Sequence, residues 1–252
     1  MIVSAYPRSG SSWITRVIAS SSNAYLTNED RVFNNYWNNK TLKKRITFWK
    51  SYFFYKKNNN LLTPSDQSRI NFITKGHFPN FEKMQESKWN LDDKFIYIYR
   101  DPRDVMISYF FFVNSRKRKK KFSSIPKSEL LEFINNNING WKKYMDSWMQ
   151  SPSCKVAYEN FLKDPLQEAK RVYTELGIPY KHESLLESIE KWSVSSFRKL
   201  KGEENLPEEQ RMVRKAKSGD WKNYFDDEMK DIMKNHLNDY LVRFSYETDD
   251  NW

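Results

Sequence analysis

The feature that most constrains the fold is the order of residue types at the N-terminus. Residues 2–5 (IVSA) predict a short buried strand, residues 6–12 a polar turn, and the apolar residues within 13–18 the buried face of a helix. A strand, a Ser/Gly turn and a helix in this order form the βα unit that binds phosphate groups. Gly10 permits a tight turn, and the helix after it presents its positive end to an anion. The N-terminus therefore predicts an anion site in an α/β fold.

The turn, YPRSGSSW over residues 6–13, supplies further hydrogen-bond donors. Arg8 adds a fixed charge with bidentate donors, and the hydroxyls of Ser9, Ser11 and Ser12 can face inward toward the anion. The turn is not a Walker loop, because GxxxxGK[ST] is absent and nothing in it supplies the Walker Lys. Taken alone, the same turn could simply cap a helix, so both interpretations remain open at this point.

Apolar runs alternate with helical patterns along the rest of the chain. Spacings of four, three, four and three predict a helix over residues 128–150 whose buried stripe is Ile134, Ile138, Trp141, Met145 and Trp148. The other predicted strands cover residues 71–75, 94–99 and 155–158. Three more helices are predicted: one begins after Arg100, one runs from Asp164-Pro165 to Gly177, and one covers residues 229–240. This alternation predicts a P-loop-like three-layer α/β fold, in which helices flank a central, mostly parallel sheet. One domain over residues 1–252 is expected.

Two segments have compositions that do not predict one clear structure. Residues 25–69 are rich in aromatic residues, Asn and Lys, and we expect irregular helices and loops there. Within them, the aromatic residues 33–55 could form a lid around an apolar or cationic small molecule. The basic run RKRKKK over residues 116–121 is expected to be a solvated loop, or else a patch that steers an anionic acceptor or a membrane surface.

Composition narrows the class of protein without naming a ligand. The net charge of +11 suits a polyanionic ligand, nucleic acid or an anionic membrane surface equally well. Cys154 is the one cysteine, which excludes an intrachain disulfide, so a reducing compartment such as the cytoplasm is expected. His77, His182 and His236 lie far apart without metal-ligand spacing, so no metal is implied. No run reaches the roughly 18 apolar residues of a membrane span, so no stable membrane insertion is expected.

Three segments resemble, in the expected order, signatures of the cytosolic-type sulfotransferases that use 3′-phosphoadenosine 5′-phosphosulfate (PAPS). Residues 6–13 are similar to the family's YPKSGTTW, residues 100–109 (RDPRDVMISY) to its R-x-P-x-D-x-x-x-S-Y, and residues 214–225 (RKAKSGDWKNYF) to its RKGxxGDWKNxF. Two weaker similarities lie between them, of residues 75–79 (KGHFP) to KTHLP and of residues 158–160 (YEN) to YED. The regions that would face an acceptor match no motif.

The resemblance implies a sulfotransferase that moves the sulfuryl group of PAPS to a hydroxyl or amine of a small-molecule acceptor and releases PAP, with no nucleic acid as partner. It implies a general base, His77, and catalytic contributions from Lys75, Arg8 and Ser108. The expected nucleotide-binding residues are Arg8, Ser9, Gly10, Ser11, Ser12, Trp13, Arg100, Ser108, Tyr158, Ser195, Phe197, Arg214, Lys215 and Ala216.

These expected residues divide into two groups by chemistry. The 3′-phosphate would be held by side chains of fixed positive charge and by a hydroxyl, with the amide of Ala216. The purine would be contacted by Trp13, Phe197 and Tyr158, although the last two are equally compatible with core positions.

The chain departs from the family pattern at several points. Arg8 stands where the family has Lys, and Ala216 where it has Gly. The family's C-terminal dimer motif, KxxxTVxxxE, is missing, so that dimer is not expected and the oligomeric state stays open.

Three other functions remain to be weighed. A kinase that uses ATP and magnesium is disfavoured by the missing Walker Lys. A basic nucleic-acid-binding protein that uses residues 116–121 would leave the motifs at 6–13 and 219–223 unexplained. A donor-binding protein without catalysis is disfavoured by Lys75 and His77.

Overall fold

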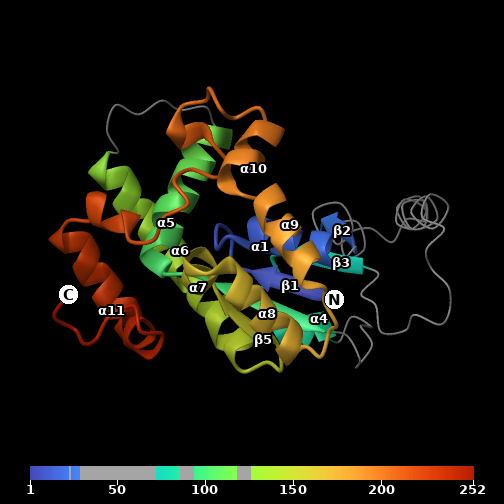
Figure 1. Ribbon diagram of the computed structural model, residues 1–252. Helices are drawn as coiled ribbons and strands as arrows, with labels where there is room; N and C mark the ends of the chain where they lie inside the picture. The colour runs from blue at the N-terminus through green and yellow to red at the C-terminus, as the bar shows by residue number, and fades with distance from the viewer. Residues whose placement is uncertain (23, 29–71, 86–93, 118–125) are drawn as a thin grey trace, which may run out of the picture.

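The computed structural model describes residues 1–22, 24–28, 72–85, 94–117 and 126–252. Within these residues, five strands form one sheet in the order β2-β3-β1-β4-β5, and every pairing is parallel (Figure 1). The strands are β1 (Ile2–Ala5), β2 (Tyr25–Asn28), β3 (Phe72–Gly76), β4 (Phe95–Tyr99) and β5 (Cys154–Ala157). The predicted α/β fold with a central parallel sheet is therefore confirmed.

Helices connect the strands and cover the sheet. They are α1 (Ser11–Ser21), α4 (Phe81–Gln85), α5 (Pro102–Phe111) with its π-helical continuation η1 (Phe112–Lys117), α6 (Lys127–Met149), α7 (Tyr158–Lys163), α8 (Pro165–Glu175), α9 (His182–Lys191), α10 (Val194–Leu200), the short 3₁₀ turns η2 (Glu208–Gln210) and η3 (Asp220–Asn223), and α11 (Asp227–Arg243). The carboxylates of Asp101, Asp164 and Asp226 each accept a hydrogen bond from a backbone N–H in the first turn of α5, α8 and α11. These caps satisfy N–H groups that no helical carbonyl can reach, which is why the helices begin there.

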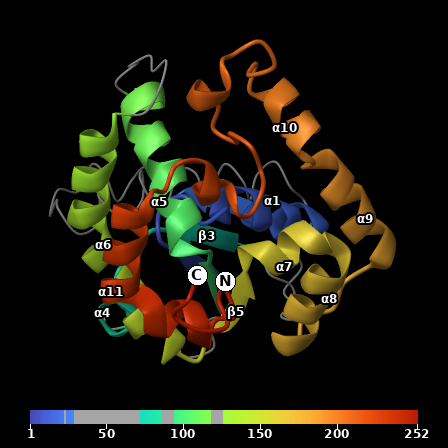
Figure 2. The ribbon, with the colours of Figure 1, turned by 90° about the vertical axis from the view of Figure 1, so that its left-hand side faces the viewer.

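Successive residues of the central strands enter two different hydrophobic cores. In β1, Ile2 packs into one core, whereas Val3 and Ala5 pack into the other, and β4 divides in the same way. The first core lies beneath α5, α6 and α11, and the second beneath α1, α8 and α9 (Figure 2). Because strand side chains alternate between the two faces of a sheet, two covered faces make a three-layer fold.

The long helix α6 buries the stripe that its sequence spacing predicts. Leu130 extends that stripe, and all its members are buried: Ile134, Ile138, Trp141, Met145 and Trp148. The indole N–H of Trp148 donates a hydrogen bond of 2.7 Å to the carbonyl of Phe78. Burial of each such side chain stabilises the fold by about 1.5–3 kcal/mol. The stripe therefore fixes the segment that follows β3 against α6.

Two sequence predictions about local structure are wrong. Residues 25–28 form the edge strand β2, although the sequence predicted irregular structure there, because pairing with β3 supplies hydrogen bonds that local composition does not reveal. Tyr158 was predicted to end a strand, but β5 stops at Ala157 and Tyr158 begins α7. The aromatic segment 33–55 and residues 118–121 of the basic run lie outside the described residues.

None of the helices in the described part of the chain combines the length and the apolar character that crossing a membrane requires.

Candidate active site

A cavity of about 210 Å³ lies where four strands of the sheet end. Residues that directly follow β1, β4 and β5 line it together with the end of β3, α5, α10 and the segment 212–217. The carboxyl ends of parallel strands meet at one edge of a sheet, where α/β proteins bind ligands. The structure brings most of the predicted site residues to this cavity: Arg8, Gly10, Ser11, Ser12, Trp13, Lys75, His77, Arg100, Ser108, Tyr158, Phe197, Arg214, Lys215 and Ala216.

Two predicted site residues are not among those that line the cavity. Ser9 is completely buried, and its hydroxyl has no hydrogen-bond partner in the described part of the chain. Ser195 is exposed on α10, with its Oγ 3.2 Å from Oγ of Ser193. Phe197, two residues later, is buried, because residues two apart on a helix point to nearly opposite sides. The sequence motif could not show which side of α10 faces the cavity.

The turn before α1 depends on glycine. Gly10 has φ 82°, and a Cβ built on it would lie 2.3 Å from Cδ2 of Tyr158. Within the described residues no side chain caps α1, and its first turn holds no acidic residue. The positive end of α1 is therefore presented to the cavity, which Ser11 and Ser12 line.

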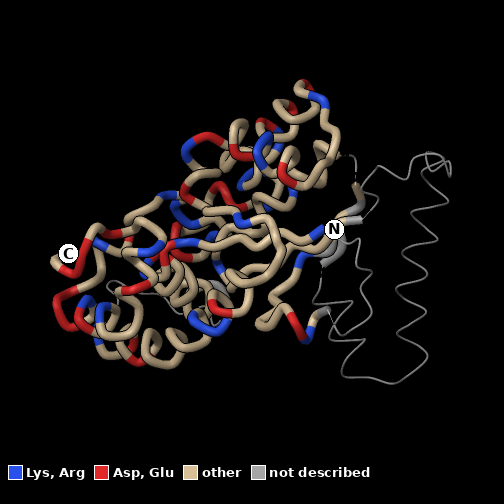
Figure 3. Tube along the Cα trace, turned by 90° about the horizontal axis from the view of Figure 1, so that it is seen from below, with Lys and Arg blue, Asp and Glu red and all other residues tan. Residues whose placement is uncertain are grey.

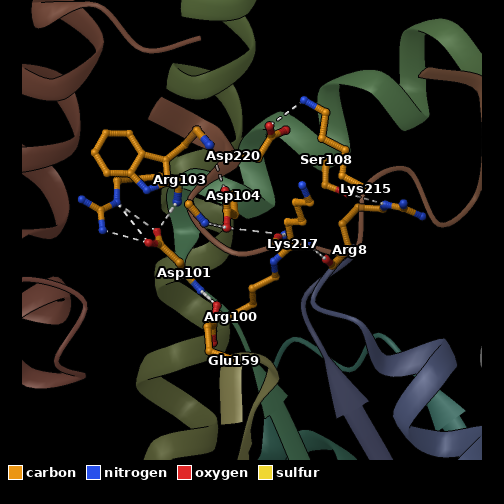
Figure 4. A network of polar contacts seen from close by, with 12 residues as sticks. Arg8, Arg100, Asp101, Arg103, Asp104, Ser108, Glu159, Lys215, Lys217 and Asp220 are labelled. Carbon is orange, nitrogen blue, oxygen red and sulfur yellow. Dashed lines mark hydrogen bonds and ion pairs between the residues drawn. The ribbon is translucent and has the colours of Figure 1, made fainter. Parts of the chain in front are cut away.

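Arg8 links the turn to two other parts of the site. Its Nε donates to Oγ of Ser108 on α5 over 3.1 Å, and its Nη2 donates to the carbonyl of Met212 over 2.6 Å. Its guanidinium carbon lies 4.8 Å from the ring centroid of Phe112. Figure 4 shows Arg8 and Ser108 side by side. The guanidinium is thereby held in one place and keeps its charge at the cavity wall.

Arg100 is a buried cation at the end of β4. It is 8% exposed, and its Nη2 donates to the carbonyl of Lys217 over 2.9 Å. It forms an ion pair of 3.5 Å with Asp104 and lies 4.4 Å above the ring of Tyr158. Its Nε has no hydrogen-bond partner within the described ranges. A buried guanidinium with an unused donor remains available to an anionic ligand.

Arg214 is a second buried cation, and it is 7% exposed. Its Nη2 is paired with Asp220, and its Nη1 donates to Glu208 and to Tyr224, each over 3.2 Å. Its Nε, like that of Arg100, finds no partner among the residues whose positions are described. Two buried guanidinium groups, each with an Nε that meets no acceptor in the described ranges, therefore line the same cavity.

Asp220 holds the two cations of the 214–225 motif together. Besides Arg214, it accepts a hydrogen bond of 2.7 Å from Lys215 (Figure 4 labels Asp220 and Lys215). Burial alone would raise the pKa of Asp220, but the hydrogen bonds from Lys215 and Arg214 outweigh it and hold this pKa below its usual value. Asp220 is therefore a carboxylate that keeps two cations in position.

Asp104 fastens the same motif to α5. Its carboxylate is fully buried and accepts hydrogen bonds from the backbone N–H groups of Gly219 and Trp221, over 2.8 and 3.0 Å. Burial raises the pKa of this carboxyl in spite of the nearby Arg100. Gly219 and Trp221 flank Asp220 in the chain. The side chain of Asp104 therefore fixes the backbone that carries Asp220.

His77 has a defined tautomer. Its Nδ1 lies 2.7 Å from the carbonyl oxygen of Ala5, and a carbonyl can only accept, so Nδ1 carries the hydrogen. In the neutral ring Nε2 is then the basic nitrogen. The backbone carbonyl of His77 accepts a hydrogen bond of 2.7 Å from Tyr144, which fixes the segment after β3. His77 and Lys75 both line the cavity, so a base and a cation stand at one end of it.

Several cavity residues were not identified from the sequence: Pro7, Phe112, Trp192, Val194, Met212, Val213, Lys217 and Asp220. Phe112 follows Ser108 by one helical turn, and Asp220 belongs to a recognised motif. The sequence therefore contained enough information to place both residues near the site. Trp192, by contrast, lies in a stretch with no motif.

The chain is similar to known proteins of one family. A family model described as the sulfotransferase domain matches residues 1–244. Flavonol 3-sulfotransferase of Flaveria bidentis is 30% identical over 178 residues, which cover 61% of this chain and 56% of that protein. Sulfotransferase 1E1 of Mus musculus is 23% identical over 278 aligned residues, which cover 98% of this chain and 86% of that protein. The match to the first of these relatives thus spans only about half of its length.

Solved structures share the fold. The crystal structure of mouse sulfotransferase SULT7A1 complexed with PAP matches with a TM-score of 0.66 at 17% identity, over 98% of this chain and 84% of that one.

Proposed function

The chain belongs to the sulfotransferase domain family, and from this premise we propose that it transfers the sulfuryl group of PAPS to a small-molecule acceptor and releases PAP. The proposed acceptor group is a hydroxyl or an amine, and the name of the relative flavonol 3-sulfotransferase supports a hydroxyl. The proposed location is the cytoplasm, because the single cysteine of the sequence cannot form an intrachain disulfide.

The main support for a phosphate-bearing donor comes from two buried arginines. Arg100 and Arg214 are each more than nine-tenths buried, and both line the cavity. No described residue accepts a hydrogen bond from the Nε–H of either side chain. A buried charged donor without a partner costs about 1–3 kcal/mol or more. A phosphate group would remove this cost, because its oxygens accept several hydrogen bonds from guanidinium groups. We assign the 3′-phosphate to this place, beside Ser108 and Lys215.

The other anionic end is assigned to the turn before α1. The uncapped first turn of α1, together with Arg8 and Lys75, would hold the 5′-phosphosulfate. The purine would lie between these ends and the aromatic wall that Trp13 and Phe197 provide. Ser108 stands between the two ends, since it accepts from Arg8 on one side and lines the cavity with Arg100 on the other.

The proposed reaction is an in-line displacement at sulfur. The acceptor oxygen forms a bond to sulfur, the bond between sulfur and the phosphate oxygen breaks, and PAP leaves with the electron pair of that bond. Nε2 of His77 takes the acceptor proton, which the hydrogen bond from Nδ1 to Ala5 makes possible. Arg8 and Lys75 stabilise charge on the transferring and leaving oxygens, and positioned cations are the main source of rate in such transfers.

The nucleic-acid alternative has less support in the structure. Lys and Arg are interspersed with Asp and Glu along the described part of the chain (Figure 3). The buried cations of the cavity are instead arranged for a ligand that enters between the strand ends.

The test combines binding and turnover. Calorimetric titration with PAP should show micromolar or tighter binding for the wild type and for His77→Ala, and much weaker binding for Arg214→Ala. With labelled PAPS and a panel of phenols, alcohols and amines, His77→Ala should lose about 10²–10⁴-fold in turnover. Arg243→Ala, an exposed change on α11, serves as the matched control. Absence of PAP and PAPS binding to the wild type at micromolar concentrations would refute the proposal.

A further inference from the structure

We propose that Trp192 determines base specificity, by donating a hydrogen bond from its indole N–H to a ring nitrogen of the purine. The inference rests on the proposed function, because it takes a purine nucleotide as the ligand of the cavity. Trp192 belongs to no recognised motif and directly follows the end of α9.

The first observation is an unused donor. Trp192 lines the cavity, its Nε1 atom is buried, and no hydrogen-bond partner for it exists in the described ranges of the chain. An indole N–H can only donate, so it needs an acceptor, and burial without one is unfavourable. A ligand that places an acceptor in the cavity would satisfy it.

The second observation is the surrounding surface, which suits a base better than a phosphate. The guanidinium carbon of Arg16 lies 5.6 Å from the Trp192 ring and 5.2 Å from the Phe197 ring. Arg16 is itself tied to the first turn of α1 by a hydrogen bond of 2.7 Å to the carbonyl of Ser12. Burial lowers the pKa of Arg16, as expected where the surroundings are apolar. Trp192, Phe197 and Val194 therefore form an aromatic and apolar wall of the cavity.

Two contacts hold Trp192 in this wall. The backbone N–H of Trp192 donates to the carbonyl of Ser188 over 3.1 Å, and the rings of Trp192 and Phe197 lie 6.5 Å apart at 53°. The cations assigned to the 3′-phosphate belong to other elements, the end of β4 and the segment 214–216. In adenine the ring nitrogens N1, N3 and N7 are acceptors, so a donor in this wall, away from the cations assigned to the 3′-phosphate, is placed to bind the base.

Trp13 offers a comparison within the same cavity. Its Nε1 is also buried without a partner among the described residues, and it precedes Arg16 by one helical turn on α1. Its place in the family motif already suggested a base contact. The inference is that Trp192 contributes separately, from a different helix.

The decisive variant is Trp192→Phe, which keeps an aromatic ring but removes the N–H donor together with part of the indole ring system. Titration uses two ligands, PAP and its abasic analogue 1-deoxyribose 3,5-bisphosphate. We expect PAP to bind about three- to tenfold more weakly to Trp192→Phe than to the wild type, with the affinity for the abasic analogue unchanged. The 1-, 3- and 7-deaza analogues of PAP then identify the acceptor, because the correct one binds both proteins equally.

Trp141→Phe is the matched control. Trp141 also has a buried Nε1 without a described partner, but it lies on the buried face of α6, in the first core, and is not among the residues that line the cavity. It should bind both ligands as the wild type does. Urea unfolding of Trp192→Phe without ligand measures what the smaller ring costs the fold, because Trp192 packs against the second core. That loss should leave the affinity for the abasic analogue unchanged.

Three results would overturn the inference. An unchanged affinity of Trp192→Phe for PAP would overturn the inference and leave the proposed function intact. Weaker PAP binding by Trp13→Phe alone would then assign the base contact to Trp13. Equal weakening of PAP and the abasic analogue would show that the change disturbs the cavity as a whole. Failure of the wild type to bind PAP would remove the proposed function together with this inference.

Discussion

Replacing Gly10 by Ala should disrupt the turn before α1 by two separable effects. Gly10 has φ 82°, and this left-handed conformation costs an L-residue about 1–2 kcal/mol. The added Cβ would also lie 2.3 Å and 2.7 Å from Cδ2 and Cε2 of Tyr158. That ring cannot retreat easily, because it is 5% exposed and Arg100 lies 4.4 Å above it. Overpacking of this kind costs about 1–3 kcal/mol, so the total loss should be about 2–5 kcal/mol.

Gly177→Ala separates the two effects. Gly177 has φ 60°, and nothing lies within 4 Å of its added Cβ, so this variant should lose only the backbone contribution of about 1–2 kcal/mol. Urea unfolding measures both variants, and calorimetry measures PAP binding. Gly10→Ala should also weaken PAP binding by at least about tenfold, because Arg8 and the first turn of α1 must move.

A second comparison tests the contact itself. In a Tyr158→Ala background, Gly10→Ala should cost no more than Gly177→Ala, because the ring that the Cβ meets is gone. The reasoning would be refuted if Gly10→Ala unfolded at the same urea concentration as Gly177→Ala in the wild-type background, or if it retained wild-type affinity for PAP.

Three further predictions concern carboxylates that hold backbone groups or cations in place. Asp104→Asn removes the acceptor of one of the two backbone N–H groups that Asp104 holds in the 214–225 motif. We therefore expect PAP to bind roughly tenfold more weakly. Unchanged affinity in calorimetry would contradict the anchoring role of Asp104. Glu247→Gln leaves the buried Arg103 without one of its two carboxylate partners, and urea unfolding should show a loss of about 1–3 kcal/mol at neutral pH. Because the folded pKa of Asp220 lies below its unfolded value of 3.8, its ionisation stabilises the fold above that pH, and the contribution is lost as the pH falls through the folded pKa. The difference in unfolding free energy between wild type and Asp220→Asn should therefore be constant near neutral pH and shrink below about pH 4, and parallel pH profiles would contradict this.

The sequence determined the parts of the fold that depend on short-range patterns. The βα unit at the N-terminus was predictable because an apolar tetrapeptide, a Ser/Gly turn and a helical stripe follow one another without interruption. The stripe of α6 was predictable because five large apolar residues recur at helical spacing and have only one way to be buried together. The starts of α5 and α8 were predictable because an Asp-Pro pair supplies both a cap and a fixed φ.

Local patterns were insufficient where distant partners decide the conformation. β2 becomes a strand because β3 offers it a parallel partner, and no short-range pattern in residues 25–28 announces that pairing. Tyr158 has a residue type that suits a strand, yet it begins α7 and packs against Gly10, more than a hundred residues earlier. Ser195 lies on the exposed side of α10, because Phe197 occupies the buried side.

For the candidate site, the sequence indicated which motifs would meet, and the fold arranges their charges. Residues 6–13, 75–79 and 100–109 could be predicted to converge, because each lies at the end of a parallel strand and such strands end at one edge of the sheet. Within the described chain, residues 214–225 directly follow no strand, and only the resemblance to the family assigned them to the site. Only the fold pairs Asp220 with two cations and places Trp192 in the cavity wall. It also leaves the Nε donors of Arg100 and Arg214 without a partner among the described residues. The physical reason is that burial and hydrogen-bond partners are properties of neighbours in space, and here those neighbours are separated widely along the chain.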